Sequence, residues 1–157
     1  MTARRLSGLL AFAVPFALLS GAYISQYGFG LYPCEMCWWQ RYPHIAAIAF
    51  GILAFALKPA RWPIALAGLA VLVSGLIGAF HAGVEYGWWE GVTACTALPS
   101  ADGDDLMEAI LNAPLVRCDV APWSLFGVSL AGWNFLISTG SALLILHLVR
   151  RSGRDLA

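Results

Sequence analysis

The sequence predicts an all-α membrane protein, a bundle of four transmembrane helices with two cysteine-bearing loops on one side. Of its 157 residues, 60% are hydrophobic and only 11% are charged, with a mean hydropathy of +0.73. An ordinary soluble domain has about a quarter of its residues charged. Four apolar runs approach the roughly 20 residues that span a bilayer. We therefore expect one membrane domain, residues 1–157, surrounded by lipid, and the net charge of zero gives no sign of a nucleic-acid partner.

The predicted helices follow the apolar runs in chain order, over residues 6–24, 38–57, 64–84 and 125–149. The second run is apolar only from Arg41 to Leu57, and a start at Trp38 gives it a spanning length. The first run, behind Arg4 and Arg5, is longer than the 7–15 apolar residues of a cleaved signal peptide, which favours a retained helix.

The loops between these helices cover residues 25–37 and 85–124, and both are predicted to be periplasmic. In the longer loop, residues 105–112 predict a short amphipathic helix that can lie in the membrane surface. Asp102 and Asp104 can cap this helix.

The charge distribution predicts the orientation of the helices. Seven of the nine basic residues fall on one side of the predicted bundle: Arg4, Arg5, Lys58, Arg61, Arg150, Arg151 and Arg154. Only Arg41 and Arg117 fall on the other side. The positive-inside rule then places both termini in the cytoplasm. The cysteine loops would face the compartment where disulfides persist, which for a bacterial inner-membrane protein is the periplasm.

The four cysteines, Cys34, Cys37, Cys95 and Cys118, permit three kinds of site. Four thiolates can hold zinc, but the 22 residues between Cys95 and Cys118 depart from the usual paired Cys-x-x-Cys pattern. Two inert disulfides would suit a non-catalytic membrane scaffold or assembly subunit with stapled loops. A Cys34–Cys37 bridge, however, closes too small a loop to constrain much chain entropy. Thiol–disulfide exchange is the third possibility and the one we favour, with no metal expected.

The residues around Cys37 favour a reactive thiolate. Cys-x-x-Cys motifs commonly have a depressed thiol pKa. Cys37 lies at the start of a predicted helix, where the positive end of the dipole stabilises an anion. Arg41 follows one helical turn later, so its guanidinium can face the sulfur.

An oxidising disulfide must pass its electrons to an acceptor. The sequence contains no haem motif, nucleotide-binding loop or metal-cluster motif, so elimination favours a quinone dissolved in the membrane. Trp38 offers a flat apolar surface for a quinone ring, and Arg41 can donate hydrogen bonds to a quinone oxygen.

Three segments carry a resemblance to a known family. They are "CEMCWWQRYPH" at residues 34–44, "FHAGVEYGWWEG" at 80–91 and "CDVAPWSLFGVSLAGWN" at 118–134. Together with the four predicted helices, they resemble the bacterial DsbB family, quinone-coupled thiol oxidases of the inner membrane. The resemblance covers nearly the whole chain.

The resemblance implies a path for the electrons. Cys34 and Cys37 would be the quinone-proximal pair, and Cys95 and Cys118 would face a periplasmic thioredoxin-fold oxidase of the DsbA type. The partner's thiolate would attack Cys95, and the released Cys118 would attack Cys34 to give an interloop bridge. Cys37 would leave as the thiolate and engage ubiquinone, or menaquinone, with Arg41 stabilising the charged complex.

Two histidines are candidates for the same site. His44 and His81 fall near the outer ends of their predicted helices and could line a quinone site or relay its protons, or be satisfied interfacial histidines. His147 is expected to be structural. Two related alternatives stay open, a paralogue dedicated to one substrate and a relative of vitamin K epoxide reductase. The second would be expected to carry a Cys-x-x-Cys in the last helix, where this chain has none.

Overall fold

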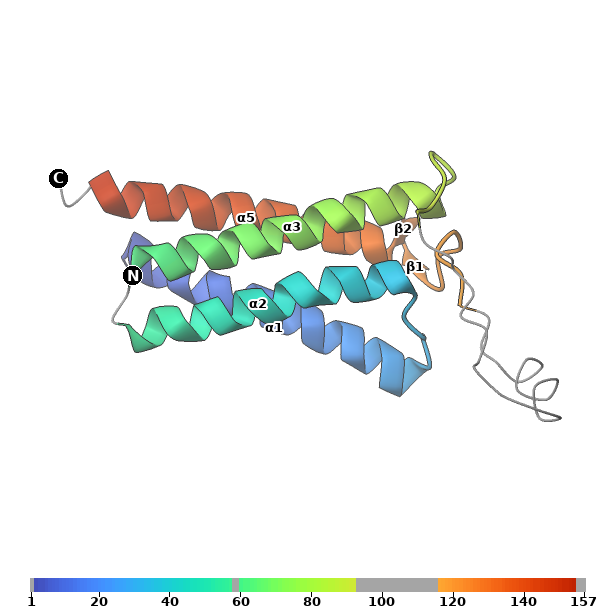
Figure 1. Ribbon diagram of the computed structural model, residues 1–157, viewed down its shortest axis with the longest axis horizontal. Coiled ribbons are helices and arrows are strands. Elements are labelled where there is room, and N and C mark those ends of the chain that lie inside the picture. The colour runs from blue at the N-terminus through green and yellow to red at the C-terminus, as the bar shows by residue number, and fades with distance from the viewer. Residues whose placement is uncertain (1, 58–59, 93–115, 155–157) are drawn as a thin grey trace, which may run out of the picture.

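The computed structural model describes residues 2–57, 60–92 and 116–154, in which long helices pack side by side as one bundle (Figure 1). The helices are α1 Ala3–Phe29, α2 Glu35–Ala56, α3 Arg61–Glu85 and α5 Leu130–Arg154. A small antiparallel hairpin of β1 Ser124–Leu125 and β2 Val128–Ser129 precedes α5. Both chain termini lie at one end of the bundle, and the connection from α1 to α2, which carries Cys34, lies at the other. We call the latter the cysteine end.

This arrangement confirms the predicted all-α fold, four helices packed as a bundle. Three of the helices, α1, α3 and residues Leu130–Ser152 of α5, are long and apolar enough to cross a membrane. α2 has 22 residues and differs from them by carrying Gln40, Arg41 and His44 in its first half. It therefore brings three buried polar side chains into the bundle.

At the cysteine end, α1 and α2 extend further than the apolar runs predict. α1 continues to Phe29, five residues past the predicted end, and stops where Gly30 adopts a left-handed φ of 67°. Glycine takes this conformation without steric cost. α2 begins at Glu35, three residues before the predicted start, because the Cys34 sulfur caps it by accepting from the Cys37 backbone N–H at 3.3 Å. One of the two cysteines of the motif is thus itself the helix cap.

The last helix begins later than predicted, at Leu130 rather than at residue 125. The chain first makes a short hairpin with a two-residue loop, in which Ser124 pairs with Ser129 and Leu125 with Val128. Its tip residues have positive φ values, 53° at Phe126 and 76° at Gly127, as the turns of tight hairpins require. A helix cannot pass through such residues, so α5 starts only after the hairpin closes.

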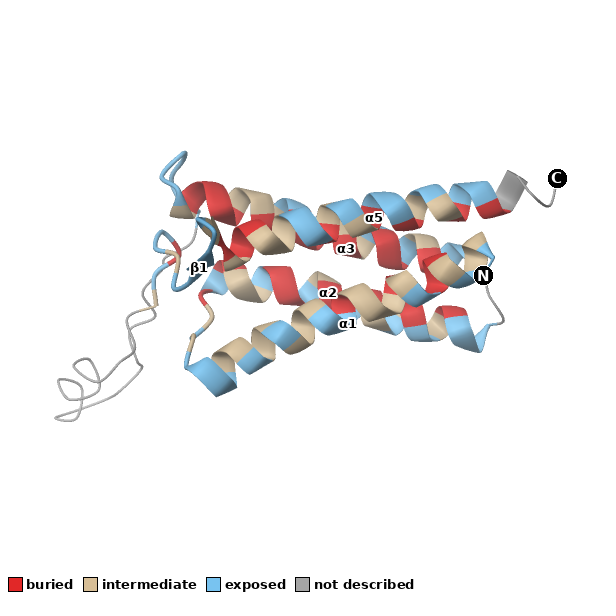
Figure 2. Ribbon diagram, turned by 180° about the vertical axis from the view of Figure 1, so that it is seen from behind, coloured by how far each residue is buried: buried red, intermediate tan, exposed pale blue. Residues whose placement is uncertain are grey.

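Buried residues form stripes that face the middle of the bundle, and the outward faces are exposed (Figure 2). Outward apolar side chains such as Phe16, Leu76 and Leu143 are each more than half exposed, which suits a lipid surrounding. The α3–α5 contact is close: a Cβ on Gly78 would lie 2.9 Å from the Ala131 carbonyl oxygen. Small residues let helices approach in this way. The close approach positions the polar side chains of α3 and α5 opposite one another.

Candidate functional site

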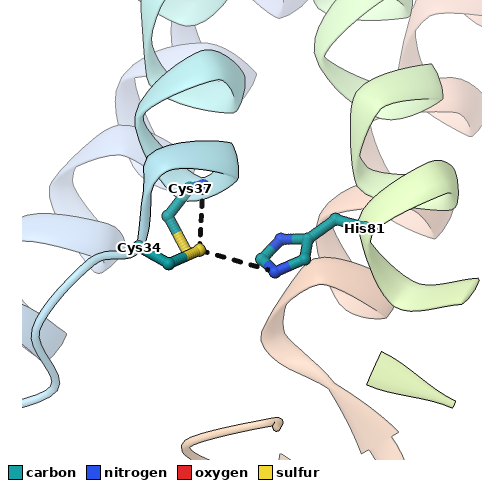
Figure 3. Close-up of side chains that lie close together, drawn as sticks. All are labelled: Cys34, Cys37 and His81. Carbon is teal, nitrogen blue, oxygen red and sulfur yellow. Dashed lines mark hydrogen bonds between the residues drawn. The ribbon is translucent and has the colours of Figure 1, made fainter. Parts of the chain in front are cut away.

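Cys34 and Cys37 lie together at the first turn of α2, with their Sγ atoms 3.1 Å apart (Figure 3). The Cys34 thiol donates to the Cys37 sulfur. Cys34 is only 6% exposed, and Cys37 is half-buried. A disulfide has an S–S length of about 2.05 Å, so the two sulfurs need to approach by only about 1 Å when an acceptor removes two electrons and the thiols lose their two protons. The geometry suits a pair that alternates between thiol and disulfide.

The two sulfurs are not equivalent. The hydrogen bond to Cys37 and the burial of the side chain raise the pKa of Cys34 to about 12. Free cysteine has a pKa near 8.5, so Cys34 keeps its proton at neutral pH. The negative charge of a singly deprotonated pair therefore resides on Cys37, as the sequence predicts.

His81 reaches this pair from α3. Its Nε2 lies 3.5 Å from the Cys34 Sγ (Figure 3), and the residue is only 2% exposed. Glu85, one turn further along α3, places Oε1 3.8 Å from the same nitrogen. The Nε2 and the two sulfurs lie within 4.8 Å of one another. One histidine, one carboxylate and two thiols thus form a compact reactive group at the cysteine end.

Cys118 also comes to this group. It is fully buried and packs in one cluster with Cys34, Met36 and Val84. The second cysteine-bearing loop therefore lies against the first, although the two cysteines are 84 positions apart in the sequence. Cys95 and the predicted helix over residues 105–112 lie outside the described residues.

Arg41 is buried, with only 6% exposed, and its guanidinium turns toward α1. It donates to Gln26 Oε1 at 2.6 Å and to the Ala22 carbonyl oxygen at 3.3 Å. It also lies over the Tyr23 ring at 5.0 Å and the Trp38 ring at 4.9 Å from their centroids.

Arg41 directs its hydrogen bonds to these partners. The hydrogen bond from Cys34 has the larger effect in lowering the pKa of Cys37, and the positive charge of Arg41 contributes further to lowering it. Within the described part of the chain, the hydrogen bonds of Arg41 go to α1, because its planar fork finds an amide and a carbonyl there. Trp38 contributes its ring face to holding the guanidinium. Trp39 and Tyr42, on the same turns, are 37% and 58% exposed, and aromatic side chains of this kind suit a membrane interface.

Two cavities, each of about 270 Å³, meet at this group. The first, which we call the mouth cavity, lies between the loops and is lined by Cys34, Val116 and Arg117 among others. The second, which we call the bundle cavity, lies between α1, α2 and α5 and has a mostly apolar lining. Cys37 and His81 line both cavities. The two cavities therefore adjoin at Cys37, and Cys34 lines the mouth cavity only.

Polar side chains connect this group to the middle of the bundle. Gln40 lies 2.9 Å from His81 Nδ1 and 2.8 Å from Asn134 Nδ2. Asn134 Oδ1 in turn lies 3.0 Å from His44 Nε2, and the Ser74 hydroxyl lies 2.9 Å from that nitrogen. His44 Nδ1 is buried and has no hydrogen-bond partner among the described residues.

Of the polar residues at this site, His44 and His81 were predicted from the sequence, whereas Gln40, Asn134 and Glu85 were not. A signal was present, because polar residues inside apolar helices are costly and usually have a function or a partner. Gln40 and His44 are four residues apart, as are His81 and Glu85, so each pair shares a helix face.

Comparison with known proteins identifies the family. Residues 4–148 match the family model described as disulfide bond formation protein DsbB.

The chain belongs to the DsbB family.

Its relatives include the disulfide bond formation protein B of Verminephrobacter eiseniae (strain EF01-2), 32% identical over 98% of this chain and 89% of that protein. The protein of the same name from Polaromonas sp. (strain JS666 / ATCC BAA-500) is 34% identical over 97% of this chain and 94% of that protein. A third, from Marinobacter nauticus (strain ATCC 700491 / DSM 11845 / VT8), is 29% identical over 99% and 98%. No solved structure matches the chain.

The family membership confirms the resemblance seen in the sequence. It makes this chain a multi-pass membrane protein and implies disulfide oxidoreductase chemistry. The compact group of two thiols and one imidazole is compatible with such chemistry.

Proposed function

We propose that this DsbB-family protein is a quinone-coupled thiol oxidase that reoxidises a periplasmic dithiol oxidase of the DsbA type. The observation that carries the proposal is the position of the cysteine pair: Cys37 lines both the mouth cavity and the bundle cavity, and Cys34 lines the mouth cavity. A thiol partner can approach from one side, and an apolar electron acceptor can occupy the other. Two electrons then cross the boundary through sulfur alone.

On the partner side, each exchange step breaks one S–S bond and forms another. The partner's thiolate attacks the Cys95–Cys118 disulfide at Cys95, and Cys118 leaves as a thiolate. Cys118 then attacks Cys34, which breaks the Cys34–Cys37 bond and releases Cys37 as a thiolate. The burial of Cys118 in one cluster with Cys34 supports this route, because it brings the required nucleophile to its target. The second thiol of the partner later attacks the mixed disulfide at the partner's own sulfur and frees Cys95, whose thiolate displaces Cys34 from Cys118.

On the acceptor side, the bundle cavity fits a quinone head group. Its lining is mostly apolar with a few convergent polar groups, including Arg41, His44, Gln40 and His81, which is the usual composition of a small-molecule site. A bound ubiquinone, or menaquinone, would accept two electrons and two protons. Arg41 would donate to a quinone oxygen through the N–H groups that α1 does not occupy. Cys37 would lie beside the ring. Trp38, which the sequence suggested for this role, is not among the residues that line the cavity, and its ring holds Arg41 instead.

The family's location in the bacterial inner membrane completes the proposal. We place both termini in the cytoplasm and the cysteine loops in the periplasm. Two observations support this orientation: the concentration of basic residues near the termini and the position of both termini at the end opposite Cys34 (Figure 1). Maleimide labelling of single cysteines introduced at either end, in intact and permeabilised cells, tests it.

The experiment that tests the function mixes the purified protein in detergent with a short-chain ubiquinone and a reduced DsbA-type protein. Quinone absorbance then reports turnover. We expect Cys37→Ser to abolish quinone loss and Arg41→Ala to weaken it. Arg61→Ala, which removes an exposed arginine at the start of α3, is the matched control and should leave the rate unchanged.

The competing proposal is a scaffold whose loops are stapled by inert disulfides. It predicts no turnover with ubiquinone or menaquinone, disulfides that no partner reduces, and an effect of Arg41→Ala on stability alone. A reduced partner that stays reduced in the presence of wild-type protein and both quinones would establish that alternative.

A further inference from the structure

We propose that Gln40 is a positioning residue that holds His81 in the tautomer with its proton on Nε2, so that His81 donates a hydrogen bond to the Cys34 sulfur. The inference deepens the proposed function, since Cys34 is attacked there by Cys118 and is later displaced from it as the leaving group. Its structural part, the tautomer of His81, can be measured without turnover.

The orientation of the Gln40 amide is fixed by its other partners. Gln40 Nε2 donates to the Met36 backbone carbonyl oxygen at 3.1 Å, and a carbonyl can only accept. On the opposite side, Gln40 Oε1 accepts from Asn134 Nδ2 at 2.8 Å. Reversing the amide would place oxygen against oxygen at Met36 and nitrogen against nitrogen at Asn134. The NH₂ group of Gln40 therefore faces His81.

Asn134 is itself held in one orientation, so it fixes which atom of the Gln40 amide faces it. Its Nδ2 donates to the Ser74 backbone carbonyl oxygen at 3.1 Å. Its Oδ1 accepts from the Ser138 hydroxyl at 2.8 Å and lies 3.0 Å from His44 Nε2. The Ser74 hydroxyl meanwhile donates to the Gln40 backbone carbonyl oxygen at 2.8 Å. Partners on three helices thus fix both amides.

The consequence for His81 follows from donor and acceptor counting. His81 Nδ1 lies 2.9 Å from Gln40 Nε2, which is a donor, so Nδ1 must be the acceptor. A neutral imidazole then carries its single proton on Nε2. That nitrogen lies 3.5 Å from the Cys34 Sγ. A second proton on His81 would bring two donors together at Nδ1, so Gln40 also opposes the imidazolium form.

This tautomer suits the chemistry of Cys34. An N–H group directed at the sulfur stabilises the thiolate that forms when Cys34 is displaced from Cys118. The opposite tautomer would direct a lone pair at the same sulfur and repel the charge. The Cys37 backbone N–H already donates to this sulfur, so His81 supplies a second donor.

Ionisable groups near His81 come from several elements, and among them Tyr32 of the α1–α2 connection and His44 of α2 line cavities that His81 lines. Glu85 lies on the same helix, at 3.8 Å from Nε2. Cys37 and Arg41 come from α2, and Arg117 comes from the second loop; each lines one or both of the cavities that His81 lines. Any of them can influence the protonation of His81, so the test must change Gln40 alone.

The test uses nitrogen-15 NMR of the reduced, detergent-solubilised full-length protein with labelled histidine. The chain has only three histidines, so single substitutions assign every ring nitrogen. We expect wild-type His81 to show a protonated Nε2 and an unprotonated Nδ1. Gln40→Glu replaces the donor with an isosteric acceptor, and it should move a proton onto Nδ1. Gln40→Met removes both functions and should give a mixture of tautomers, while the signals of the distant His147 stay unchanged.

Two results would overturn the proposal. One is a wild-type His81 that carries its proton on Nδ1. The other is a His81 tautomer that stays the same in Gln40→Glu or in Gln40→Met, because Cys34 or Glu85 would then be setting it. If either Gln40→Glu or Gln40→Met fails to fold, the other variant still tests the proposal.

Turnover supplies an independent readout. We expect quinone reduction by Gln40→Glu to fall about tenfold at neutral pH, the effect of losing one hydrogen bond to a charged atom. Its pH profile should gain a step from His81 that the wild type lacks, which a merely structural defect would not produce. If wild-type protein shows the expected tautomer but reduces no quinone, the proposed function fails and the role of Gln40 in setting the tautomer stands.

Discussion

Replacing Arg41 with lysine keeps the positive charge and removes the planar fork. The structure gives the guanidinium four partners at once: the amide of Gln26, the carbonyl of Ala22 and the ring faces of Tyr23 and Trp38. An ammonium group is a point charge and cannot reproduce this set. We therefore expect Arg41→Lys to behave as a damaging substitution despite its conserved charge.

The magnitude can be worked from those contacts. A hydrogen bond to a charged group contributes about 1.5–3 kcal/mol, and each cation–π contact about 0.5–2 kcal/mol. Lysine can satisfy one of the α1 acceptors while losing the other and misplacing the N–H groups that face the bundle cavity. A loss equivalent to one charged hydrogen bond raises the KM for quinone about 10- to 100-fold, since about 1.4 kcal/mol is a factor of ten.

The assay is steady-state quinone reduction at varied quinone concentration with saturating reduced partner, beside a thermal unfolding curve for each variant. We expect Arg41→Lys to raise the KM for quinone and to leave the KM for the partner unchanged. A variant whose KM for quinone stays within about twofold of wild type would show that charge alone suffices, and the geometric argument would be wrong.

Three further predictions concern other parts of the molecule. The pKa of Cys34 is raised to about 12, so its thiol is protonated below that pH. Iodoacetamide should therefore label Cys37 first at pH 7–9 and Cys34 only as the pH approaches 12. Equal labelling of the two cysteines at pH 8 would contradict this. Phe126→Gly should raise the stability of the hairpin by about 1 kcal/mol, because the left-handed φ of 53° is costly for a phenylalanine, and an unchanged or lower melting temperature would argue against strain there. Gly78→Ala should destabilise the bundle by about 1–3 kcal/mol, because the new Cβ would meet the α5 backbone at 2.9 Å. Gly21→Ala, whose Cβ would enter open space, is the neutral control in the same melting experiment.

The apolar runs were sufficient to predict the bundle and the position of the cysteine motif. They were insufficient for the helix ends, because those depend on single residues. Gly30 ends α1 through its φ, the Cys34 side chain starts α2, and the left-handed turn at Phe126 delays α5. Phenylalanine is not a residue that signals such a turn, so the hairpin had no clear mark in the sequence.

The site was predictable where its residues are neighbours along the chain. The Cys-x-x-Cys spacing brought Cys34 and Cys37 together as expected. The partners of Arg41 were not predictable, because local spacing on α2 says nothing about the acceptors that α1 presents. The contact between Gln40 and Asn134 joins residues 94 positions apart, and it requires the rotation of each helix about its own axis, which apolar composition does not supply.

The size of the bundle cavity has a consequence for which electron acceptors the protein can accept. At about 270 Å³, it lies at the lower limit of pockets that enclose drug-sized ligands, which run from about 300 Å³ upward. It has room for one aromatic ring system and little of an isoprenoid chain, so that chain must extend into the surrounding lipid. Selection among natural quinones would then depend on the ring and its substituents. Quinones that differ only in the number of isoprene units in the chain would bind with similar affinity.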